Sequence, residues 1–198
     1  MGWTTLQWLK HERPGLLMVH EGPGLPFVAP PLGSDIELRS WEPGDDAGWI
    51  ALLNANGSFG SWDLDRLATE TAGLIKEGQY FAVSAGKLAA GAGVLERPLS
   101  GQPALEIGWV VRHPEFKRKG LGLSVTLAAL DYALNTAANR TVYLYTDDHR
   151  LTAISMYLDL GFQPRIRSHR SYAKRWDKVF RDLAARNESG LTEAASEP

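Results

Sequence analysis

Two glycines, Gly120 and Gly122, separate a basic tripeptide from a long apolar run in residues 113–134, HPEFKRKGLGLSVTLAALDYAL. The apolar run predicts a helix over 120–135, while PALEIGWVVRHP before it and RTVYLYTDD after it are typical of strands. A strand, a glycine turn, a helix and a second strand in this order imply at least one parallel strand pair. The predicted fold class is therefore α/β or α+β, with a mixed sheet.

Further strands and helices are predicted on both sides of this unit. Strands are expected at 16–22, 36–41, 140–148 and 162–169, and two more within 79–98 are joined by a tight turn at Ala85-Gly86-Lys87. Helices are expected at 42–56, at 62–78 with an end at Gly78, at 150–161 and at 172–186. The predicted organisation is an arm at 1–34, one main domain at 35–172, a C-terminal helix at 173–188 and a disordered tail at 189–198.

The composition argues against several classes of protein. The formal net charge is −2, which gives no overall basic field to hold nucleic acid. The chain has no cysteine, so disulfides, thiolate metal sites and cysteine nucleophiles are excluded, and its five histidines lack the spacing of metal ligands. No apolar run is long enough to span a membrane, and the N-terminus lacks the apolar block of a signal peptide. We therefore expect a cytoplasmic protein without a metal.

The glycine loop has the features of an anion site. The first turn of a helix leaves backbone N–H groups without partners, and the helix dipole makes that end positive. Glycines allow a ligand to approach the backbone closely, and Lys117, Arg118 and Lys119 add positive charge. The nucleoside triphosphate loop and the dinucleotide fingerprint both fail here, since Val125 stands at the third glycine position of the latter. On the local sequence alone, a tight turn with solvated cations remains an equal alternative.

A second motif extends the interpretation. Residues 150–162, RLTAISMYLDLGF, follow the glycine loop after a predicted helix and strand. Together the two motifs resemble those of the GNAT superfamily of acetyl-CoA-dependent N-acetyltransferases, with some features of the bacterial mycothiol synthases. The resemblance covers residues 36 to 170. It implies a mixed, mainly antiparallel sheet of about six to seven strands with a splayed central parallel pair, flanked by helices.

The resemblance also implies a binding site for acetyl-CoA, the acyl donor. The loop amides would bind the pyrophosphate of coenzyme A, and the preceding strand would hydrogen-bond its pantetheine arm. Lys117 stands where the family more often has Gln or Arg, and Arg150 stands where it has Asn. The residues assigned to the coenzyme are Val110, Val111, Arg112, Lys117, Arg118, Lys119, Gly120, Leu121, Gly122, Leu123, Ser124 and Arg150.

Two residues are candidates for catalysis. Tyr157 matches the tyrosine of the family motif and would protonate the thiolate of coenzyme A; the alternative is a core tyrosine. Glu106 lies on the strand before the loop, where we expect its side chain to share a face with Gly108 and Val110. A carboxylate among apolar neighbours can have a raised pKa and act as general base. The alternative for Glu106 is an exposed or ion-paired strand residue.

The sequence therefore predicts a GNAT-type N-acetyltransferase that moves an acetyl group from acetyl-CoA to an amine by direct transfer in a ternary complex. The alternative is a non-catalytic acyl-CoA-binding sensor or scaffold. The acceptor is a small-molecule or peptide amine, with neither nucleic acid nor a membrane as partner, and a homodimer is left open. The basic run at 165–178 is interpreted as a solvated helix face rather than an RNA site.

Overall fold

The computed structural model describes residues 15–22, 24–25, 31–138, 140–166 and 170–195. The chain divides into two compact units. The larger unit is His20–Leu144, and the smaller unit combines Met1–Val19 with Tyr145–Pro198. Each unit is described below by itself.

The larger unit is built on antiparallel strands in sequence order. They are β2 (Ile36–Ser40), β3 (Leu74–Ser84), β4 (Lys87–Glu96) and β5 (Ala104–Arg112), each antiparallel to the next. The strand β6 (Thr141–Thr146) pairs in parallel with β5. This parallel pair is the crossover expected from the glycine loop and its helix.

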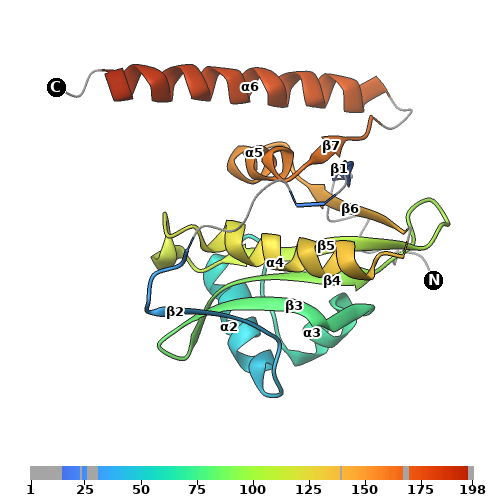
Figure 1. The fold of residues 1–198 in the computed structure, drawn as a ribbon, viewed down its shortest axis with the longest axis vertical. Helices are drawn as coiled ribbons and strands as arrows, with labels where there is room; N and C mark the ends of the chain where they lie inside the picture. The colour runs from blue at the N-terminus through green and yellow to red at the C-terminus, as the bar shows by residue number, and fades with distance from the viewer. Residues whose placement is uncertain (1–14, 23, 26–30, 139, 167–169, 196–198) are drawn as a thin grey trace. The chain divides into compact units, whose positions relative to one another are not determined.

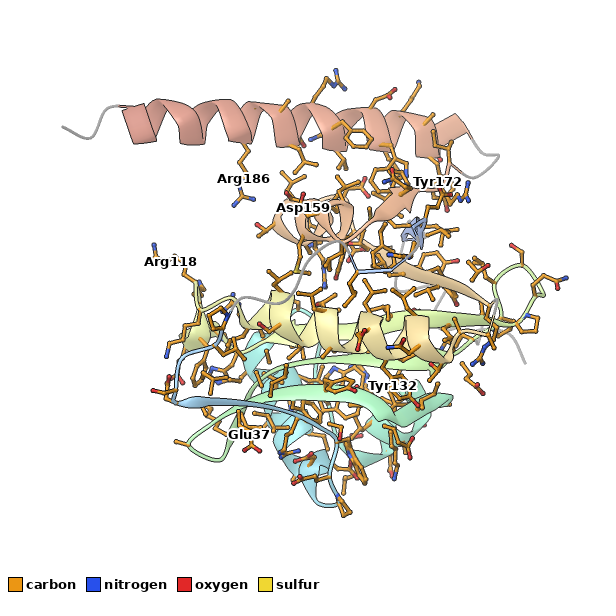
Figure 2. The ribbon with its side chains drawn as sticks, in the orientation of Figure 1. Glu37, Arg118, Tyr132, Asp159, Tyr172 and Arg186 are labelled. Atoms are coloured by element: carbon orange, nitrogen blue, oxygen red, sulfur yellow. The ribbon has the colours of Figure 1, made fainter. Side chains whose placement is uncertain are left out.

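Helices cover both faces of this sheet (Figure 1). The helix α4 (Leu121–Thr136) packs on β3, β4 and β5, and Figure 2 shows Tyr132 of α4 reaching toward the sheet. The opposite face is covered by α2 (Asp45–Asn56) and α3 (Leu64–Glu70). A core cluster on this second face joins Trp49, Leu52, Leu53, Trp62 and Leu67 to Phe81, Val83, Leu88 and Val111 of the sheet.

The smaller unit contains β1 (Leu16–His20), the end of β6, α5 (Leu151–Asp159), β7 (Phe162–Pro164) and α6 (Arg170–Ala195). The N–H of Arg165 donates to the carbonyl of Leu17 at 2.9 Å. The helix α6 contacts α5 and buries Tyr172, Trp176 and Val179. With these strands the sheet has the order β2-β3-β4-β5-β6-β1-β7, which confirms the predicted mixed, mainly antiparallel class.

The helix predicted at 62–78 is wrong in its second half. The helix α3 ends at Glu70, and β3 begins at Leu74. Between them the chain reverses at Gly73, whose φ is +86°. A Cβ atom at Gly73 would lie 2.8 Å from the carbonyl oxygen of Glu96, so the reversal depends on a close approach to β4 that periodicity cannot reveal.

The other predicted boundaries of helices and strands agree with the structure in some places and differ from it in others. The predicted turn after β3 is present, with positive φ at Ala85 and Gly86, as a two-residue hairpin turn of type I′ requires. Residues 1–14 of the predicted arm lie outside the described residues, and 16–20 form β1. The last strand ends at Pro164, short of the predicted 169, and residues 167–169 lie outside the described residues. The helix α6 extends to Ala195, so it includes part of the segment predicted as a tail.

Candidate functional site

The N-terminus of α4 is open and has no side-chain cap. Gly120 occupies the N-cap with φ +71°, and the first turn contains no acidic residue. By contrast, the side chain of Asp63 caps α3 by accepting from the N–H of Arg66 at 2.8 Å. A Cβ atom at Gly120 or Gly122 would meet nothing within 4 Å, so the space before these amides is open. The first-turn N–H groups are therefore arranged to receive an anion.

Positive charge surrounds this open helix end. Lys117, Arg118 and Lys119 are exposed, and Figure 2 shows Arg118 pointing outward from the loop before α4. Lys119 lies 3.4 Å from a carboxylate oxygen of Asp35, whereas the structure records no acidic partner for Lys117 or Arg118 among the described residues. The positive field of the loop is therefore only partly neutralised by the protein, which favours binding of a polyanion.

Short contacts fix the segment between β5 and this loop. The side chain of Asn56 donates from Nδ2 to the carbonyl of Arg112 at 2.9 Å. The N–H of His113 donates to the carbonyl of Ala89 at 2.8 Å, and its Nδ1 accepts from the N–H of Glu115 at 3.3 Å. This last contact caps the short 3₁₀ helix Pro114–Phe116. The end of β5 and the loop are thus held in one position relative to α2 and β4.

The strand β5 is irregular where the coenzyme arm is expected. Its recorded pairing with β6 ends at Glu106 and Tyr143, so the strands splay beyond this point. On the other side, Gly91 pairs with Val111 and Gly93 with Gly108, which leaves Trp109 and Val110 opposite Ala92 alone. This is a β-bulge, and Trp109 at its centre has φ +55°. The residues predicted to bind the pantetheine arm, 110–112, lie in the splayed half of β5.

The bulge shows that the side chain of Glu106 does not share a face of the sheet with Val110, contrary to the prediction from the sequence. Because paired residues point to the same face, Glu106 lies on the face of Gly108 and Val111 and not on that of Val110. The extra residue in the bulge reverses the alternation after Trp109. This face carries the core cluster with α2 and α3.

The carboxylate of Glu106 is largely buried and has two partners. The residue is 9% exposed, and its Oε2 lies 3.4 Å from both Nη1 of Arg97 and the hydroxyl of Tyr143. Burial raises the pKa of Glu106, while the charge of Arg97 and the hydrogen bonds from Arg97 and Tyr143 lower it. A carboxylate with a raised pKa is a stronger base than one at the ordinary value, which is the property that a general base needs.

Tyr157 and Arg150 lie in the smaller unit. Tyr157 is 6% exposed, and its ring packs edge-on against Phe162 at 6.1 Å. Burial raises its pKa to about 12, against a smaller opposing effect of Arg150. Arg150 occupies the N-cap of α5, where it pairs with Asp147 at 3.2 Å. The structure therefore places Glu106, Val110–Arg112 and the loop in the larger unit, and Tyr157 and Arg150 in the smaller one.

Two polar groups near the bulge were not predicted from the sequence. The Oε1 atom of Gln79 and the Nε1 atom of Trp109 are buried and have no hydrogen-bond partner in the described structure. The alternating glycines of β4, Gly91 and Gly93, are the sequence signal that could have indicated a large neighbour there.

Neither a metal site nor a membrane span stands out in the described residues. Within the ranges given above, no three His, Asp or Glu side chains are grouped to hold a metal ion. None of the described helices combines the length and apolar character needed to cross a membrane.

Comparison with known proteins assigns the family. The model of the acetyltransferase (GNAT) family matches residues 46–162, which is more than half of the chain. The chain belongs to this family. The match includes α2, α3, the bulged strand β5, the glycine loop and α5, so it spans the features described above.

Similar proteins agree with this assignment. The chain is 31% identical to the mycothiol acetyltransferase of Thermobispora bispora, over 69% of this chain and 50% of that protein. It is also 31% identical to the mycothiol acetyltransferase of Actinosynnema mirum, over 74% of this chain and 50% of that protein. The chain thus spans about half the length of these curated relatives. Among solved structures, the GCN5-related N-acetyltransferase of Sphaerobacter thermophilus is similar in fold, with a TM-score of 0.60, 19% identity, and coverage of 81% of this chain and 52% of that chain.

Proposed function

We propose that this protein is an acetyl-CoA-dependent N-acetyltransferase that acts in the cytoplasm. The observation that carries the proposal is the open, uncapped N-terminus of α4, placed directly after the splayed and bulged half of β5. An enzyme that uses coenzyme A must hold a pyrophosphate and an extended pantetheine arm side by side. The loop and the strand offer amides for each of these two parts.

The pyrophosphate would bind the amides of residues 118–123, with Lys117, Arg118 and Lys119 adding charge. The pantetheine arm would pair with the unpaired edge of β5 at Val110–Arg112, as an added strand does. Arg150 is a further candidate contact to the coenzyme. Backbone amides would make most of the contacts to the pyrophosphate. Lys117 in place of the family's usual Gln or Arg is therefore compatible with binding.

The chemistry proposed is direct transfer within a ternary complex. The neutral amine attacks the thioester carbon, so that a C–N bond forms and the C–S bond breaks. Glu106 accepts the proton that the amine loses, and the coenzyme thiolate receives a proton from Tyr157. With a pKa of about 12, Tyr157 keeps its proton throughout the neutral range and can donate it. A backbone N–H at the bulge would stabilise the developing oxyanion, a contribution of about 3 kcal/mol in comparable sites.

The first experiment is calorimetric titration of the full chain with acetyl-CoA, beside the variant Gly120→Glu. The added carboxylate would stand in the open space before the α4 amides and repel the pyrophosphate. Gly101→Glu is the matched control, because Gly101 also has a positive φ and open space around it but lies in the β4–β5 connection. We expect binding in the wild type and the control, and its loss in Gly120→Glu. Absence of binding by the wild type would overturn the proposal.

Turnover needs a second measurement. Release of free coenzyme A thiol from acetyl-CoA should depend on an added amine, and mass spectrometry should show that the amine gains an acetyl group. Coenzyme binding without amine-dependent thiol release across a broad panel of amines would instead favour a binding module.

A further inference from the structure

One arginine joins the buried carboxylate of Glu106 to the end of a helix. Arg97 follows directly after β4, and its Nη1 lies 3.4 Å from Oε2 of Glu106. Its Nη2 donates to the carbonyl of Glu70 at 2.6 Å. Glu70 is the last residue of α3, and a carbonyl in the last turn of a helix has no partner within that helix. A single guanidinium therefore contacts both the candidate base and a helix end.

The backbone of Arg97 is held by hydrogen bonds to two strands. Its N–H donates to the carbonyl of Ala104 at 3.3 Å, and its carbonyl accepts from the hydroxyl of Tyr143 at 3.3 Å. The same hydroxyl lies 3.4 Å from Oε2 of Glu106. Arg97, Tyr143 and Glu106 therefore form a closed cycle, in which each residue contacts the other two.

The surroundings of Glu106 leave Arg97 as its charged neighbour. Among the residues that the structure describes, Arg97 supplies the one charge recorded against this carboxylate. Leu95, which pairs with Glu106 from β4, is apolar, and the carboxylate of Glu70 lies 4.0 Å from Nε of Arg66 instead. The side chains of Arg97 and Glu106 are only 26% and 11% exposed. Salt and solvent therefore screen this pair less than an exposed pair.

The guanidinium of Arg97 is shared between two acceptors. Its N–H groups form a rigid planar fork, so a change at one acceptor alters the contact with the other. When Glu106 is protonated, it attracts the positive charge less, and Arg97 is left to the carbonyl of Glu70. When the end of α3 moves away, the guanidinium is released toward the carboxylate and favours its charged form. The two contacts are therefore coupled in both directions.

We infer that Arg97 is a positioning residue for the reaction, because it links the protonation of Glu106 to the last turn of α3. This inference rests on the proposed function, in which Glu106 accepts the proton that the amine loses, and it names a means of regulating that same site. Arg97 itself transfers no proton and acts only through Glu106. A substitution or a ligand that displaces the end of α3 therefore changes the base without touching it.

The test follows the carboxyl group directly by NMR, in the full chain labelled with ¹³C at the side-chain carboxyl carbon of glutamate. The resonance missing in Glu106→Gln is assigned to Glu106. In Arg97→Gln the midpoint of its titration should rise by about one pH unit, because a neighbouring positive charge is lost. Arg97→Lys restores the charge and should return the midpoint toward the wild-type value. The same midpoint in Arg97→Gln and in the wild type would overturn the inference.

Arg140→Gln is the matched control. Arg140 also joins a strand carboxylate to the end of a helix, since its Nη1 donates to Oε1 of Glu96 at 2.7 Å and its Nη2 to the carbonyl of Thr136 at 3.0 Å. Glu96 is exposed and has no proposed role in the reaction. The control should leave the titration of Glu106 unchanged. A rise equal to that in Arg97→Gln would overturn the inference, because the loss of any such arginine would then have the same effect.

The carbonyl carbon of Glu70, observed through the amide of Thr71, tests the link to α3. In the wild type its chemical shift should change at the same midpoint as the carboxyl group of Glu106. This step should be absent in Glu106→Gln and in Arg97→Gln, and Arg140→Gln should keep it. A wild-type carbonyl that does not respond at that midpoint would overturn the inference.

Turnover separates this role from a general loss of structure. In Arg97→Gln the acidic limb of the pH profile of kcat should move with the carboxyl titration, so that kcat falls about tenfold on the acidic side and approaches the wild-type value at alkaline pH. An equal loss at every pH would indicate a purely structural role and overturn the inference. Failure of the wild type to bind acetyl-CoA would overturn the proposed function and this inference together. Coenzyme binding and turnover with an unmoved titration in Arg97→Gln would overturn this inference alone.

Discussion

The carboxylate of Glu106 lies 3.4 Å from the hydroxyl of Tyr143, the residue that it faces across the parallel pair of β5 and β6. This is the last recorded pair before the two strands splay. The hydrogen bond from Tyr143 lowers the pKa of Glu106, whereas burial raises it. Tyr143 is therefore a position from which the protonation of Glu106 can be changed without altering Glu106 itself.

Tyr143→Phe should move the acidic limb of the pH profile of kcat to higher pH. The variant removes a hydrogen bond to the charged form of Glu106, so the pKa of the carboxyl rises further. Glu106→Gln should abolish the limb and lower kcat about a hundredfold. The profile is measured with a saturating amine from about pH 4, near the ordinary pKa of a carboxyl group, to about pH 9. An acidic limb that survives in Glu106→Gln would assign the base elsewhere.

The raised pKa of Glu106 also predicts how stability depends on pH. Between the ordinary value of 4.5 and the higher folded value, the native state binds more protons than the unfolded state. The free energy of unfolding should therefore decrease as pH rises through this window, and the contribution is fully present only below 4.5. Urea titrations of the wild type and Glu106→Gln at several pH values measure the slope. The two proteins should differ in slope within the window and run parallel above it; parallel curves throughout would contradict the shift.

Tyr157→Phe should lower kcat by about two orders of magnitude and leave coenzyme affinity unchanged, because the phenol is proposed to donate a proton and not to hold the coenzyme. Single-turnover kinetics and calorimetry measure the two quantities. Tyr172→Phe is a control, since Tyr172 is also a buried tyrosine of the smaller unit but lies on α6. Equal kcat values for Tyr157→Phe and the wild type would leave Tyr157 as a core residue.

Gly73→Ala should destabilise the protein more than Gly57→Ala. Both glycines have positive φ, so both variants carry the strain of about 1 kcal/mol that alanine meets there. Only at Gly73 would the new Cβ atom also press on backbone, 2.8 Å from the carbonyl oxygen of Glu96. The expected additional loss is about 1–3 kcal/mol in the free energy of unfolding, measured by urea titration. Equal losses would mean that the connection between α3 and β3 can shift to relieve the contact.

Local patterns in the sequence predicted the parts of this fold that depend on local chemistry. The hairpin turn at Ala85-Gly86 and the glycine-opened start of α4 each follow from a few neighbouring residues. The helix predicted at 62–78 failed because its end is set by the approach of Gly73 to β4, a contact between residues far apart in sequence. The bulge at Trp109 has the same origin, since register is a property of paired strands.

In the candidate site too, features set by neighbouring residues could be predicted from the sequence, whereas features set by strand pairing and packing could not. The loop residues 117–124 carry their signal in composition and spacing, and the burial of Glu106 fits its apolar neighbours along β5. The face on which Glu106 lies could not be predicted, because one extra residue in the bulge reverses the alternation. Gln79 and Trp109 belong to no motif; Gln79 packs against β4 and Trp109 against the α2–α3 loop, and these contacts cannot be read from the sequence. The catalytic roles of Glu106 and Tyr157 stay predictions.

The close fit of Gln79 over Gly93 also sets the order in which these positions can change. A side chain at 93 cannot be accepted while the amide oxygen of Gln79 occupies the place of its Cβ atom, 2.1 Å away. A substitution at 93 therefore requires the amide of Gln79 to move, and a library that first shortens residue 79 should accept alanine or serine at 93 more readily than one that changes 93 alone. Any change of side chain at this point of β4 must therefore begin in β3, one strand away from the position that is to be changed.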